Sequence, residues 1–504
     1  MKLIKKITDY KLEILVFVFF VLLRLPSLGH DLFNTDVWKW KARTYDFGTG
    51  VFTLDFEKTI QKYHPGVTLM WTGVAGVKIF NLYNKVPEAN VAFIFGLHSV
   101  QKILVVLIIG ITMSSIFYVL KKLFGKKYAL LTTFLICVEP FYVALTRVFH
   151  LEGLMTTFMI ASLVWFYLSL QRGKGFIQSA IFASLSVLTK TSALILLPFF
   201  GIIFFLRKEF RKGAIWFCIF ILGFVFLWPA MYTHSLLALE TLYRGIFTIG
   251  IERSHIQLFL GKWVEDPGIT FYPIVFLLRS SIYLLVGLVG YPFLKNKDKQ
   301  KTGFIKYMFS FGLLYFISMN IPAKKLDRYL LPTMISWLFV VAAFFEGYLD
   351  KLKTAVFVGI AIFILIYLHP NYLSYYTVGL RNGIHMIEPK WMFGQREIQD
   401  YFKASDFERF KDGETFDQYI NNDELENKLT IGFKEKYYTQ VWPFINEIGG
   451  RATIKDITAQ AKQTNVFVYP VWDDDSFSED RFKIKFIGNI KLRGVPIYNV
   501  YQRD

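Results

Sequence analysis

A set of ionisable side chains lies at the ends of long apolar stretches of the sequence. A charged side chain at bilayer depth is costly, and such residues usually mark a pathway or a functional site. Lys190 is the clearest case, because it lies between the apolar segments LSVL and SALILLP. Taken singly, each residue could equally be an ordinary loop charge. The set consists of Asp36, His64, Arg147, His150, Glu152, Lys190, Arg279, Lys324, Lys325, Asp327 and Arg328.

The cations and carboxylates of this set suggest complementary chemistry. Several Lys and Arg side chains beside a membrane are suited to hold a phosphate at the level of the lipid headgroups. Carboxylates such as Asp36 and Glu152 could act as a general base or bind a divalent metal ion. The residue types therefore indicate a site for a phosphate at the level of the lipid headgroups.

The elements that carry these residues are expected to be membrane-spanning helices. The chain has 504 residues, of which 54% are hydrophobic and 19% charged, whereas a soluble globular chain has about 25% charged residues. A helix of roughly 20 apolar residues spans a bilayer, and a soluble domain cannot surround many helices that are apolar on all sides. The runs that are almost free of charge are 12–23, 103–120, 153–170, 214–228 and 354–368.

The formal net charge of +18 is distributed as in a membrane protein rather than in a nucleic-acid-binding protein. Lys and Arg cluster in short segments between apolar runs, which is the pattern of cytoplasmic loops. We therefore expect a multi-pass protein of the plasma or inner membrane, with a cytoplasmic N-terminus and a retained first span. The clusters include Lys2, Lys5 and Lys6, Lys121, Lys122, Lys126 and Lys127, Arg207, Lys208, Arg211 and Lys212, and Lys295, Lys297, Lys299 and Lys301.

With these clusters as cytoplasmic markers, the sequence predicts about eleven spans within residues 1–370. Residues 30–90 form a long first external loop with an apolar stretch at 66–80, and residues 234–270 form a second external loop. Residues 176–206 are predicted to be a hairpin that turns on the outer side at Lys190. The expected spans are 12–29, 91–120, 128–145, 153–170, the two halves of 176–206, 214–233, 271–294, 304–321, 329–346 and 354–368.

Residues 371–504 have a different composition and are expected to form a small α/β domain outside the membrane. Alternating or continuous apolar segments predict strands at 429–433, 465–471, 482–488 and 496–502. The segments EIQDYFKASDF and IKDITAQAKQ are typical of helices.

Several segments, in this order and on this side of the membrane, resemble the dolichyl-phosphate-mannose–protein mannosyltransferase superfamily, in its bacterial and archaeal branch. The chain is also similar to the aminoarabinose lipid A transferase group. The resemblance covers nearly the whole chain and is carried by FNTDVWKWKARTYDFGTGVF, YHPGVTLMW, TRVFHLEGLMTTFM, LTKTSALILLP, DPGITFYPIVFLLRSS, KKLDRYLLP, HPNYLSYYTVGL and GVPIYNVY.

The resemblance implies a C-type glycosyltransferase that moves a sugar from a polyprenyl-phosphate carrier to an acceptor, with inversion. Asp36 would then be the general base, and Glu152 would position the acceptor or bind a metal. Developing negative charge on the leaving phosphate needs cations. The resemblance assigns that role to Arg147, Lys190, Arg279, Lys325 and Arg328, with further contacts from His64, His150, Lys324 and Asp327.

Two departures from the superfamily pattern leave the metal question open. Relatives often have an Asp-Glu pair in the first loop, where this chain has Asp36 followed by Val37. Their second external acid is usually Asp, and here it is Glu152.

The alternative interpretation is a transporter or flippase for lipid-linked sugars. The sugar and the acceptor, whether protein, glycolipid or envelope glycan, are left open by the sequence.

Overall fold

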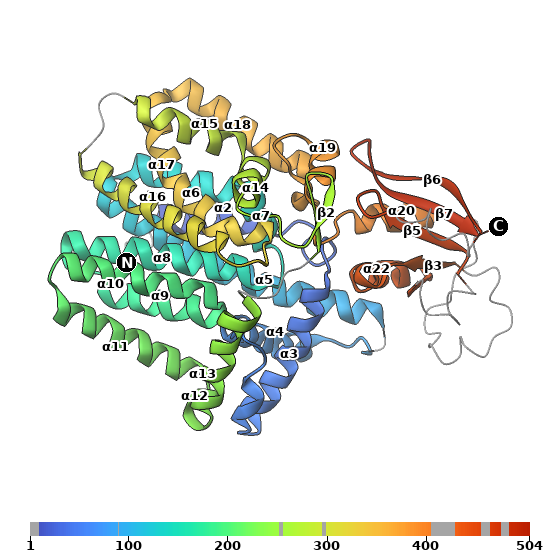
Figure 1. Cartoon of the computed structure of the whole chain (residues 1–504), viewed down its shortest axis with the longest axis horizontal. Coiled ribbons are helices and arrows are strands. Elements are labelled where there is room, and N and C mark those ends of the chain that lie inside the picture. Colours follow the sequence, from blue (N-terminus) through green and yellow to red (C-terminus); the bar gives the residue numbers. More distant parts are fainter. Residues whose placement is uncertain are drawn as a thin grey trace, which may run out of the picture.

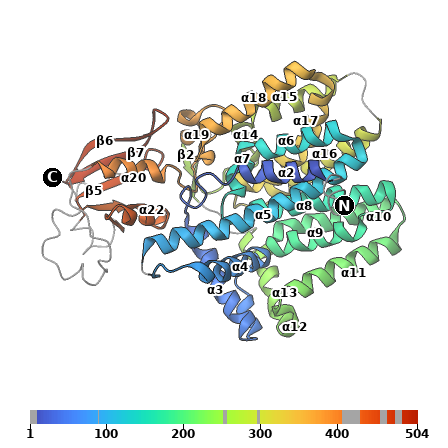
Figure 2. The same ribbon diagram turned by 180° about the vertical axis from the view of Figure 1, so that it is seen from behind.

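The computed structural model consists of a large helical bundle and a smaller part that contains a β-sheet (Figure 1). It describes residues 10–88, 90–250, 256–294, 299–404, 429–454, 464–474 and 483–503. The sheet lies beyond one end of the bundle, as both views show (Figure 2). We call this the domain end of the bundle.

The bundle follows the predicted spans closely. Each predicted span overlaps one helix, or two helices joined at a break, but α2 ends at Leu22, seven residues before the predicted end of the first span. The helices are α2 (Lys11–Leu22), α5 (Val91–Phe124), α6 (Lys126–Val138), α7 (Pro140–Thr146), α8 (Leu151–Arg172), α9 (Phe176–Thr189), α10 (Leu196–Leu206), α11 (Phe210–Leu227), α14 (Phe271–Arg279), α15 (Ile282–Gly290), α16 (Lys299–Asn320), α17 (Leu331–Tyr348) and α18 (Lys351–Leu368).

Among the described residues, five helices are long and apolar enough to cross a membrane, or up to seven spans if each bent pair counts as one. Three shorter apolar helices accompany them. The predicted total of about eleven crossings therefore stays a prediction, although the predicted ranges are helical.

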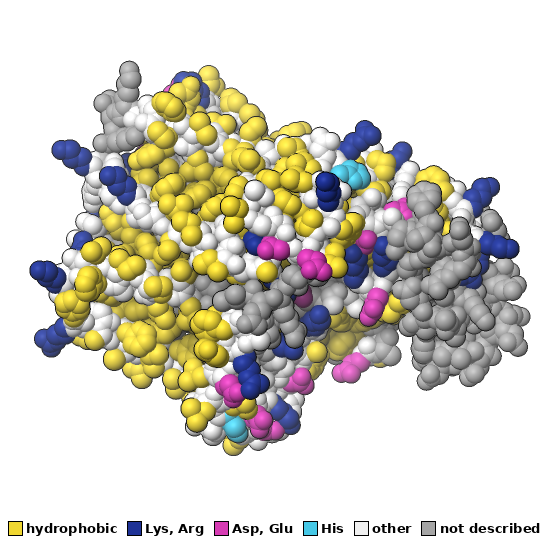
Figure 3. Space-filling model, viewed as in Figure 1, with side chains coloured by type: hydrophobic (Ala, Val, Ile, Leu, Met, Phe, Trp, Pro, Cys, Tyr) yellow, Lys and Arg dark blue, Asp and Glu magenta, His cyan; other side chains and the backbone are white. Residues whose placement is uncertain are grey.

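The surface of the bundle is suited to lipid. Apolar side chains cover most of it, with Lys and Arg at the end away from the sheet and charges of both signs at the domain end (Figure 3). α8 and α17 form the centre of the bundle, because 83% of the 18-residue apolar stretch of each helix is buried. In α11 only 17% of the corresponding stretch is buried. Exposed Phe217, Leu222 and Phe226 of α11 thus face outward, as in a lipid-exposed helix.

Two predicted spans are broken near the domain end. α6 and α7 meet at 67°, and α14 and α15 meet at 111°. Glu139, between α6 and α7, accepts hydrogen bonds from the backbone N–H and the hydroxyl of Ser281, which lies between α14 and α15. The spans predicted at 128–145 and 271–294 are therefore each bent at a break, where a buried carboxylate caps the freed backbone.

The first external loop is largely helical, which the sequence analysis did not predict. It contains α3 (Thr35–Phe52) and α4 (Val67–Tyr83), and α4 coincides with the predicted apolar stretch. The side chain of Asn34 caps α3 by accepting from the N–H of Val37 at 2.8 Å. Gly66 has a positive φ of 64°, and a Cβ there would meet the ring of Trp40 at 2.1 Å, so only glycine fits.

The C-terminal part has a mixed five-stranded sheet in the order β4-β3-β5-β7-β6. Its strands are β3 (Thr430–Phe433), β4 (Arg451–Ile454), β5 (Val466–Pro470), β6 (Ile484–Leu492) and β7 (Val495–Arg503). β3 pairs in parallel with β4 and β5, and β7 pairs antiparallel with β5 and β6. The four predicted strands are present, β4 was missed, and most of the helix predicted at IKDITAQAKQ lies outside the described residues.

Three helices connect this sheet to the bundle. They are α19 (Leu380–Met386), α20 (Gln395–Lys403) and α22 (Glu435–Glu447). The second external loop contributes a hairpin of β1 (Gln257–Phe259) and β2 (Lys262–Val264), and Phe259 bridges to Ile387 after α19. The segment between α19 and α20 thus runs across the domain end of the bundle.

Candidate functional site

Two carboxylates face each other at the domain end, each in the first turn of a helix. Asp36 lies in the first turn of α3, and Glu152 in the first turn of α8. The positive end of a helix dipole stabilises an ionised carboxylate at such positions. Glu152 is 1% exposed, whereas the side chain of Asp36 keeps 32% of its surface exposed and is thus the more accessible of the two.

The guanidinium of Arg328 joins the two acids. Arg328 lies in the 3₁₀ turn η5 (Asp327–Leu330), just before α17. Its Nη2 is 3.2 Å from Oδ2 of Asp36, and its Nε is 3.2 Å from Oε1 of Glu152. One cation therefore bridges two acids that come from distant parts of the chain.

Lys190 supplies a second cation at the same place. The helix α9 ends at Thr189, and Lys190 is extended before the 3₁₀ turn η2 (Thr191–Ile195), which confirms the predicted break. Its Nζ is 2.9 Å from Oε1 of Glu152 and 3.9 Å from the centre of the Tyr329 ring. The N–H of Gly66 donates to the carbonyl of Thr189 and ties the first external loop to this break.

His150 lies between the two acids. It occupies the cap position of α8, and its Nδ1 is hydrogen-bonded to Oε2 of Glu152. Its Nε2 is 3.7 Å from Oδ2 of Asp36. The structure thus brings five predicted site residues into one cluster, which we call the acid–base cluster: Asp36, His150, Glu152, Lys190 and Arg328.

The charges around Asp36 favour its ionised form. Burial raises the pKa of this carboxyl, but the charges of Arg328 and His150 and a hydrogen bond from Trp391 outweigh burial and lower the pKa below 3.8. Asp36 is therefore a carboxylate at neutral pH and can accept a proton only as a weak base.

Two further predicted residues border the cluster. Burial and the charge of Lys190 lower the pKa of His64 well below 6.5, so its ring is neutral at pH 7 and hydrogen-bonds to Thr191 at 2.9 Å. Lys324 is half-buried, and burial and the charge of Arg328 lower its pKa. Among the described residues Lys324 has no ion-pair partner, which leaves its charge available to a ligand.

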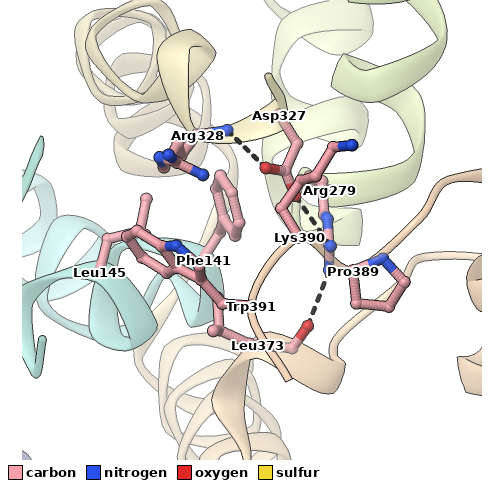
Figure 4. A pocket seen from close by; sticks show the side chains of 9 residues that line it. All are labelled: Phe141, Leu145, Arg279, Asp327, Arg328, Leu373, Pro389, Lys390 and Trp391. Atoms are coloured by element: carbon pink, nitrogen blue, oxygen red, sulfur yellow. Dashed lines mark hydrogen bonds and ion pairs between the residues drawn. The ribbon is translucent and has the colours of Figure 1, made fainter. Parts of the chain in front are cut away.

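Arg279 and Asp327 form a pair in the adjoining pocket (Figure 4). Nη2 of Arg279 is 2.8 Å from Oδ2 of Asp327, and Nη1 donates to the carbonyls of Leu373 and Tyr375. Arg328 lines the same pocket, so this pair is next to the acid–base cluster but not part of it. Its hydrogen bonds fix the start of the C-terminal part against α14.

The structure places two predicted phosphate ligands elsewhere. Arg147 donates to Asp31 at 2.9 Å and 2.6 Å, and Lys102 pairs with the same carboxylate, so this buried group holds the first loop to α5 and α7. Lys325 is 3.0 Å from Asp266 in the second external loop. Both cations are engaged outside the acid–base cluster.

Three residues of the site escaped the sequence analysis. Trp391 and Lys390 line the pocket of Figure 4 beside Arg328, and Tyr329 lies against Lys190. Tyr329 directly follows Arg328, a predicted site residue, so the sequence already indicated a site at this position. Trp391 and Lys390 lie in the tail, in the segment IEPKWMFG, where neither hydropathy nor charge pattern indicates a site.

The arrangement of the carboxylates does not suit a metal ion. Both acids are engaged by Arg328, and Glu152 also by Lys190, which leaves few free oxygens for a cation. Within the part of the chain that the structure describes, no group of three or more His, Cys, Asp or Glu side chains is arranged to hold a metal ion.

A protein-family model matches part of the chain. Residues 89–232 match the family model described as Dolichyl-phosphate-mannose-protein mannosyltransferase. This stretch contains Arg147, His150, Glu152 and Lys190. A search of curated proteins finds no match to the chain.

Two solved structures of one protein share the fold of this chain. The chain is similar to ArnT from Cupriavidus metallidurans bound to undecaprenyl phosphate, with a TM-score of 0.54, 10% identity and coverage of 97% of each chain. The apo crystal structure of the same protein gives a TM-score of 0.52 at 10% identity and the same coverage. The oligosaccharyltransferase from Archaeoglobus fulgidus gives a TM-score of 0.47 at 12% identity, covering 98% of this chain and 76% of that chain.

The predicted resemblance to the mannosyltransferase superfamily, with its similarity to ArnT, is confirmed. So is the predicted fold, a helical membrane protein with a small β-containing C-terminal part. The chain is a multi-pass membrane protein, and the family match points to a membrane glycosyltransferase that uses lipid-linked sugar donors.

Proposed function

We propose that the chain transfers a sugar from a polyprenyl-phosphate donor to an extracytoplasmic acceptor, with inversion of the anomeric carbon. The acceptor is a protein, a glycolipid or an envelope glycan. The domain end of the bundle would face away from the cytoplasm, because Lys and Arg side chains gather at the opposite end of the face shown in Figure 3.

One observation carries this proposal. Arg328 contacts both Asp36 and Glu152, and Lys190 contacts Glu152, so two acids and two cations converge at the domain end of the bundle. A group-transfer site for a phosphate leaving group needs this combination, with cations for the phosphate and a carboxylate for the acceptor proton.

The proposed step is a single displacement. The acceptor oxygen attacks the anomeric carbon while its proton passes to the carboxylate of Asp36. The bond between the anomeric carbon and the phosphate oxygen breaks, and the electron pair leaves with the polyprenyl phosphate. The leaving group gains one negative charge, which Arg328, Lys190 and Lys324 stabilise.

Donor binding would also prepare the base. In the structure Arg328 is engaged by the two acids, which keeps the pKa of Asp36 low. A donor phosphate that attracts Arg328 weakens its contact with Asp36, and the carboxylate becomes a stronger base. Glu152 holds Lys190 and His150 in place and contributes to acceptor positioning.

The carrier is supported by the shared fold. The ArnT structure is bound to undecaprenyl phosphate, and a long polyprenyl chain is compatible with the apolar surface of this bundle (Figure 3). We therefore expect a polyprenyl phosphate carrying a hexose or a pentose as donor.

The proposal is tested with the full chain purified in detergent and reconstituted in liposomes. Synthetic polyprenyl-phosphate hexoses and a pentose are offered with a membrane extract of the native host as acceptor source, and free polyprenyl phosphate is measured. We expect one donor to be consumed, and the Asp36→Asn variant to consume almost none. Movement of intact donor across the liposome bilayer without release of polyprenyl phosphate would instead favour the transporter interpretation.

The acceptor class follows from a second measurement. Glycans and lipids of host cells that lack the chain are compared by mass spectrometry with those of cells complemented with wild type or Asp36→Asn. A sugar that disappears and is restored only by wild type identifies both the sugar and its acceptor.

A further inference from the structure

Trp391 reaches the acid–base cluster from the C-terminal part of the chain. It lies between α19 and α20, and its side chain is 6% exposed. Figure 4 shows it lining one pocket with Arg328, Phe141 and Leu145. A large aromatic side chain from the C-terminal part is therefore buried against residues of α7 and η5.

Trp391 contacts both partners of the Asp36–Arg328 pair. Its indole Nε1 donates to Oδ2 of Asp36 at 3.2 Å. The guanidinium carbon of Arg328 is 4.3 Å from the centre of the indole ring, a cation–π distance. The ring of His150 lies edge-on, 4.9 Å away.

These contacts orient the carboxylate. Oδ2 of Asp36 accepts from both Trp391 and Arg328. Among the described residues no donor is hydrogen-bonded to Oδ1, and the side chain is partly exposed. One oxygen is thus fixed by the protein, while the other can meet an acceptor hydroxyl.

Helix α22 of the C-terminal part is hydrogen-bonded to residues next to Trp391 and next to Asp36. The N–H of Met392, next to Trp391, donates to the side chain of Gln440 in α22 at 2.9 Å. Thr439 of the same helix contacts Thr35 at 2.7 Å and accepts from the indole of Trp38 at 2.6 Å. α22 therefore binds the segment that carries Trp391 and the turn of α3 that carries Asp36.

We propose that Trp391 is a positioning residue that fixes Asp36 and Arg328 relative to each other, so that the C-terminal part of the chain completes the site. This inference rests on the proposed function, because it assumes that Asp36 accepts the acceptor proton. The indole N–H holds the carboxylate, and the indole face keeps the guanidinium in the plane that reaches both acids.

The test is Trp391→Phe, which keeps an aromatic face for Arg328 and removes only the N–H donor to Asp36. The matched control is Trp71→Phe, which also removes one indole hydrogen bond. In wild type, Trp71 of α4 donates this bond to the carbonyl of Leu227, the last residue of α11, at 2.8 Å. Turnover is measured in liposomes as release of polyprenyl phosphate from the donor that wild type consumes. Folding is monitored by the melting temperature and by size-exclusion chromatography in detergent.

We expect Trp391→Phe to lower kcat by about tenfold with little change in donor KM, because the carboxylate of Asp36 is no longer held in the orientation that meets the acceptor hydroxyl. The acid limb of the pH–kcat profile should move to higher pH, since a carboxylate that loses a donor is protonated more easily. Groups that face Asp36 and stay unchanged are Arg43, Tyr63, His150, Glu152, Lys324, Arg328 and Tyr329. Trp71→Phe should match wild type in both readouts.

The outcomes separate this inference from the proposed function. Wild-type kcat and an unshifted pH profile in Trp391→Phe, with Asp36→Asn inactive, overturn the positioning role and leave the proposed function standing. Full activity of Asp36→Asn overturns both. Should Trp391→Phe fail to fold, Trp391→Met carries the same test, because its thioether fills apolar space and has no N–H or O–H to donate to Asp36.

Discussion

Arg328 and Asp36 are 292 residues apart in the chain, yet Nη2 of the arginine is 3.2 Å from Oδ2 of the aspartate. The contact joins α3 of the first external loop to η5 before α17. Each residue also has a second partner, Glu152 for Arg328 and Trp391 for Asp36. Four distant segments therefore meet in one charged cluster at the domain end of the bundle.

Replacement of Arg328 should impair transfer more than replacement of a neighbouring cation. Arg328→Gln removes the guanidinium that is shared by Asp36 and Glu152 and that we assign to the donor phosphate. Loss of one charge-assisted contact costs about 1.5–3 kcal/mol, so we expect donor turnover to fall roughly tenfold to a hundredfold. The measurement is release of polyprenyl phosphate in liposomes.

The control for this variant is Lys325→Gln, three residues earlier in the chain. Lys325 pairs with Asp266, outside the acid–base cluster. Turnover of Lys325→Gln should stay close to wild type. Equal losses in both variants would mean that the whole segment, rather than Arg328, is needed.

Asp31 should be important for stability rather than for donor binding. Burial raises the pKa of Asp31, but Lys102 and Arg147 outweigh burial and lower it to about 2. Asp31→Asn leaves these two buried cations without their carboxylate, which should cost about 3–5 kcal/mol of stability. The melting temperature in detergent measures this loss, with Asp55→Asn, whose partner Lys58 is also exposed, as a control that should stay near wild type.

The ion pairs of Asp31 with Lys102 and Arg147 predict a pH dependence of protein stability. A carboxyl whose pKa is lowered in the folded protein stabilises the fold above its unfolded pKa, and that stability is lost as pH falls toward the folded pKa. For Asp31 the loss should therefore begin near pH 4 and continue toward about pH 2. In Asp31→Asn the loss of melting temperature over this range should be smaller.

Turnover should depend on pH through Asp36 in a related way. Its lowered pKa keeps the carboxylate ionised well below neutrality, so Asp36 should cause no loss of activity between about pH 7 and about pH 5. In Arg328→Gln burial remains while the opposing charge is gone, and the pKa of Asp36 should rise. The acid limb of the pH profile of turnover should then move to higher pH in Arg328→Gln. Identical acid limbs in wild type and Arg328→Gln would contradict the assignment of Asp36 as the general base.

The orientation of the chain is a separate prediction. The Lys-rich clusters place the N-terminus and residues 295–301 in the cytoplasm and residues 371–504 outside. Reporter fusions after Asp504 and within 295–301 should report opposite sides of the membrane. Activity of both reporters on the same side would invalidate the proposed location of the site.

The sequence was sufficient to locate the apolar helices of the bundle, though not α3, and most acids and cations of the candidate site. Hydropathy determines where a chain enters lipid, and charges at span ends are few, so Asp36, Glu152, Lys190 and Arg328 could be found without a structure. The breaks between α6 and α7 and between α14 and α15 could not, because they depend on the contact of Glu139 with Ser281. That contact joins residues 142 positions apart.

The sequence could not separate structural cations from those of the site. Arg147 and Arg279 are arginines at helix ends, and a phosphate ligand of the site is expected to have this residue type and position. Only the fold shows that Arg147 lies on Asp31 and Arg279 on Asp327. Trp391 escaped for the same reason, since its role depends on a contact with Asp36, 355 positions away.

The role of Glu152 can be separated from that of Asp36. Glu152→Gln should reduce turnover less than Asp36→Asn if Glu152 only orients Lys190 and the acceptor. It should reduce turnover as strongly if Glu152 binds an essential metal ion. Treatment of wild type with a chelator distinguishes the two cases, because only the second predicts loss of activity.

The most direct measurement compares turnover and donor binding in Asp36→Asn. The amide keeps the shape of the side chain and its hydrogen-bonding capacity but cannot accept the acceptor proton. A general base accelerates its step by roughly 10²–10⁴-fold, so turnover should fall by that factor. Binding of polyprenyl phosphate, which depends on Arg328, Lys190 and Lys324, should stay close to wild type. Full turnover in Asp36→Asn, with Glu152→Gln inactive, would show that the base is Glu152 and contradict the account.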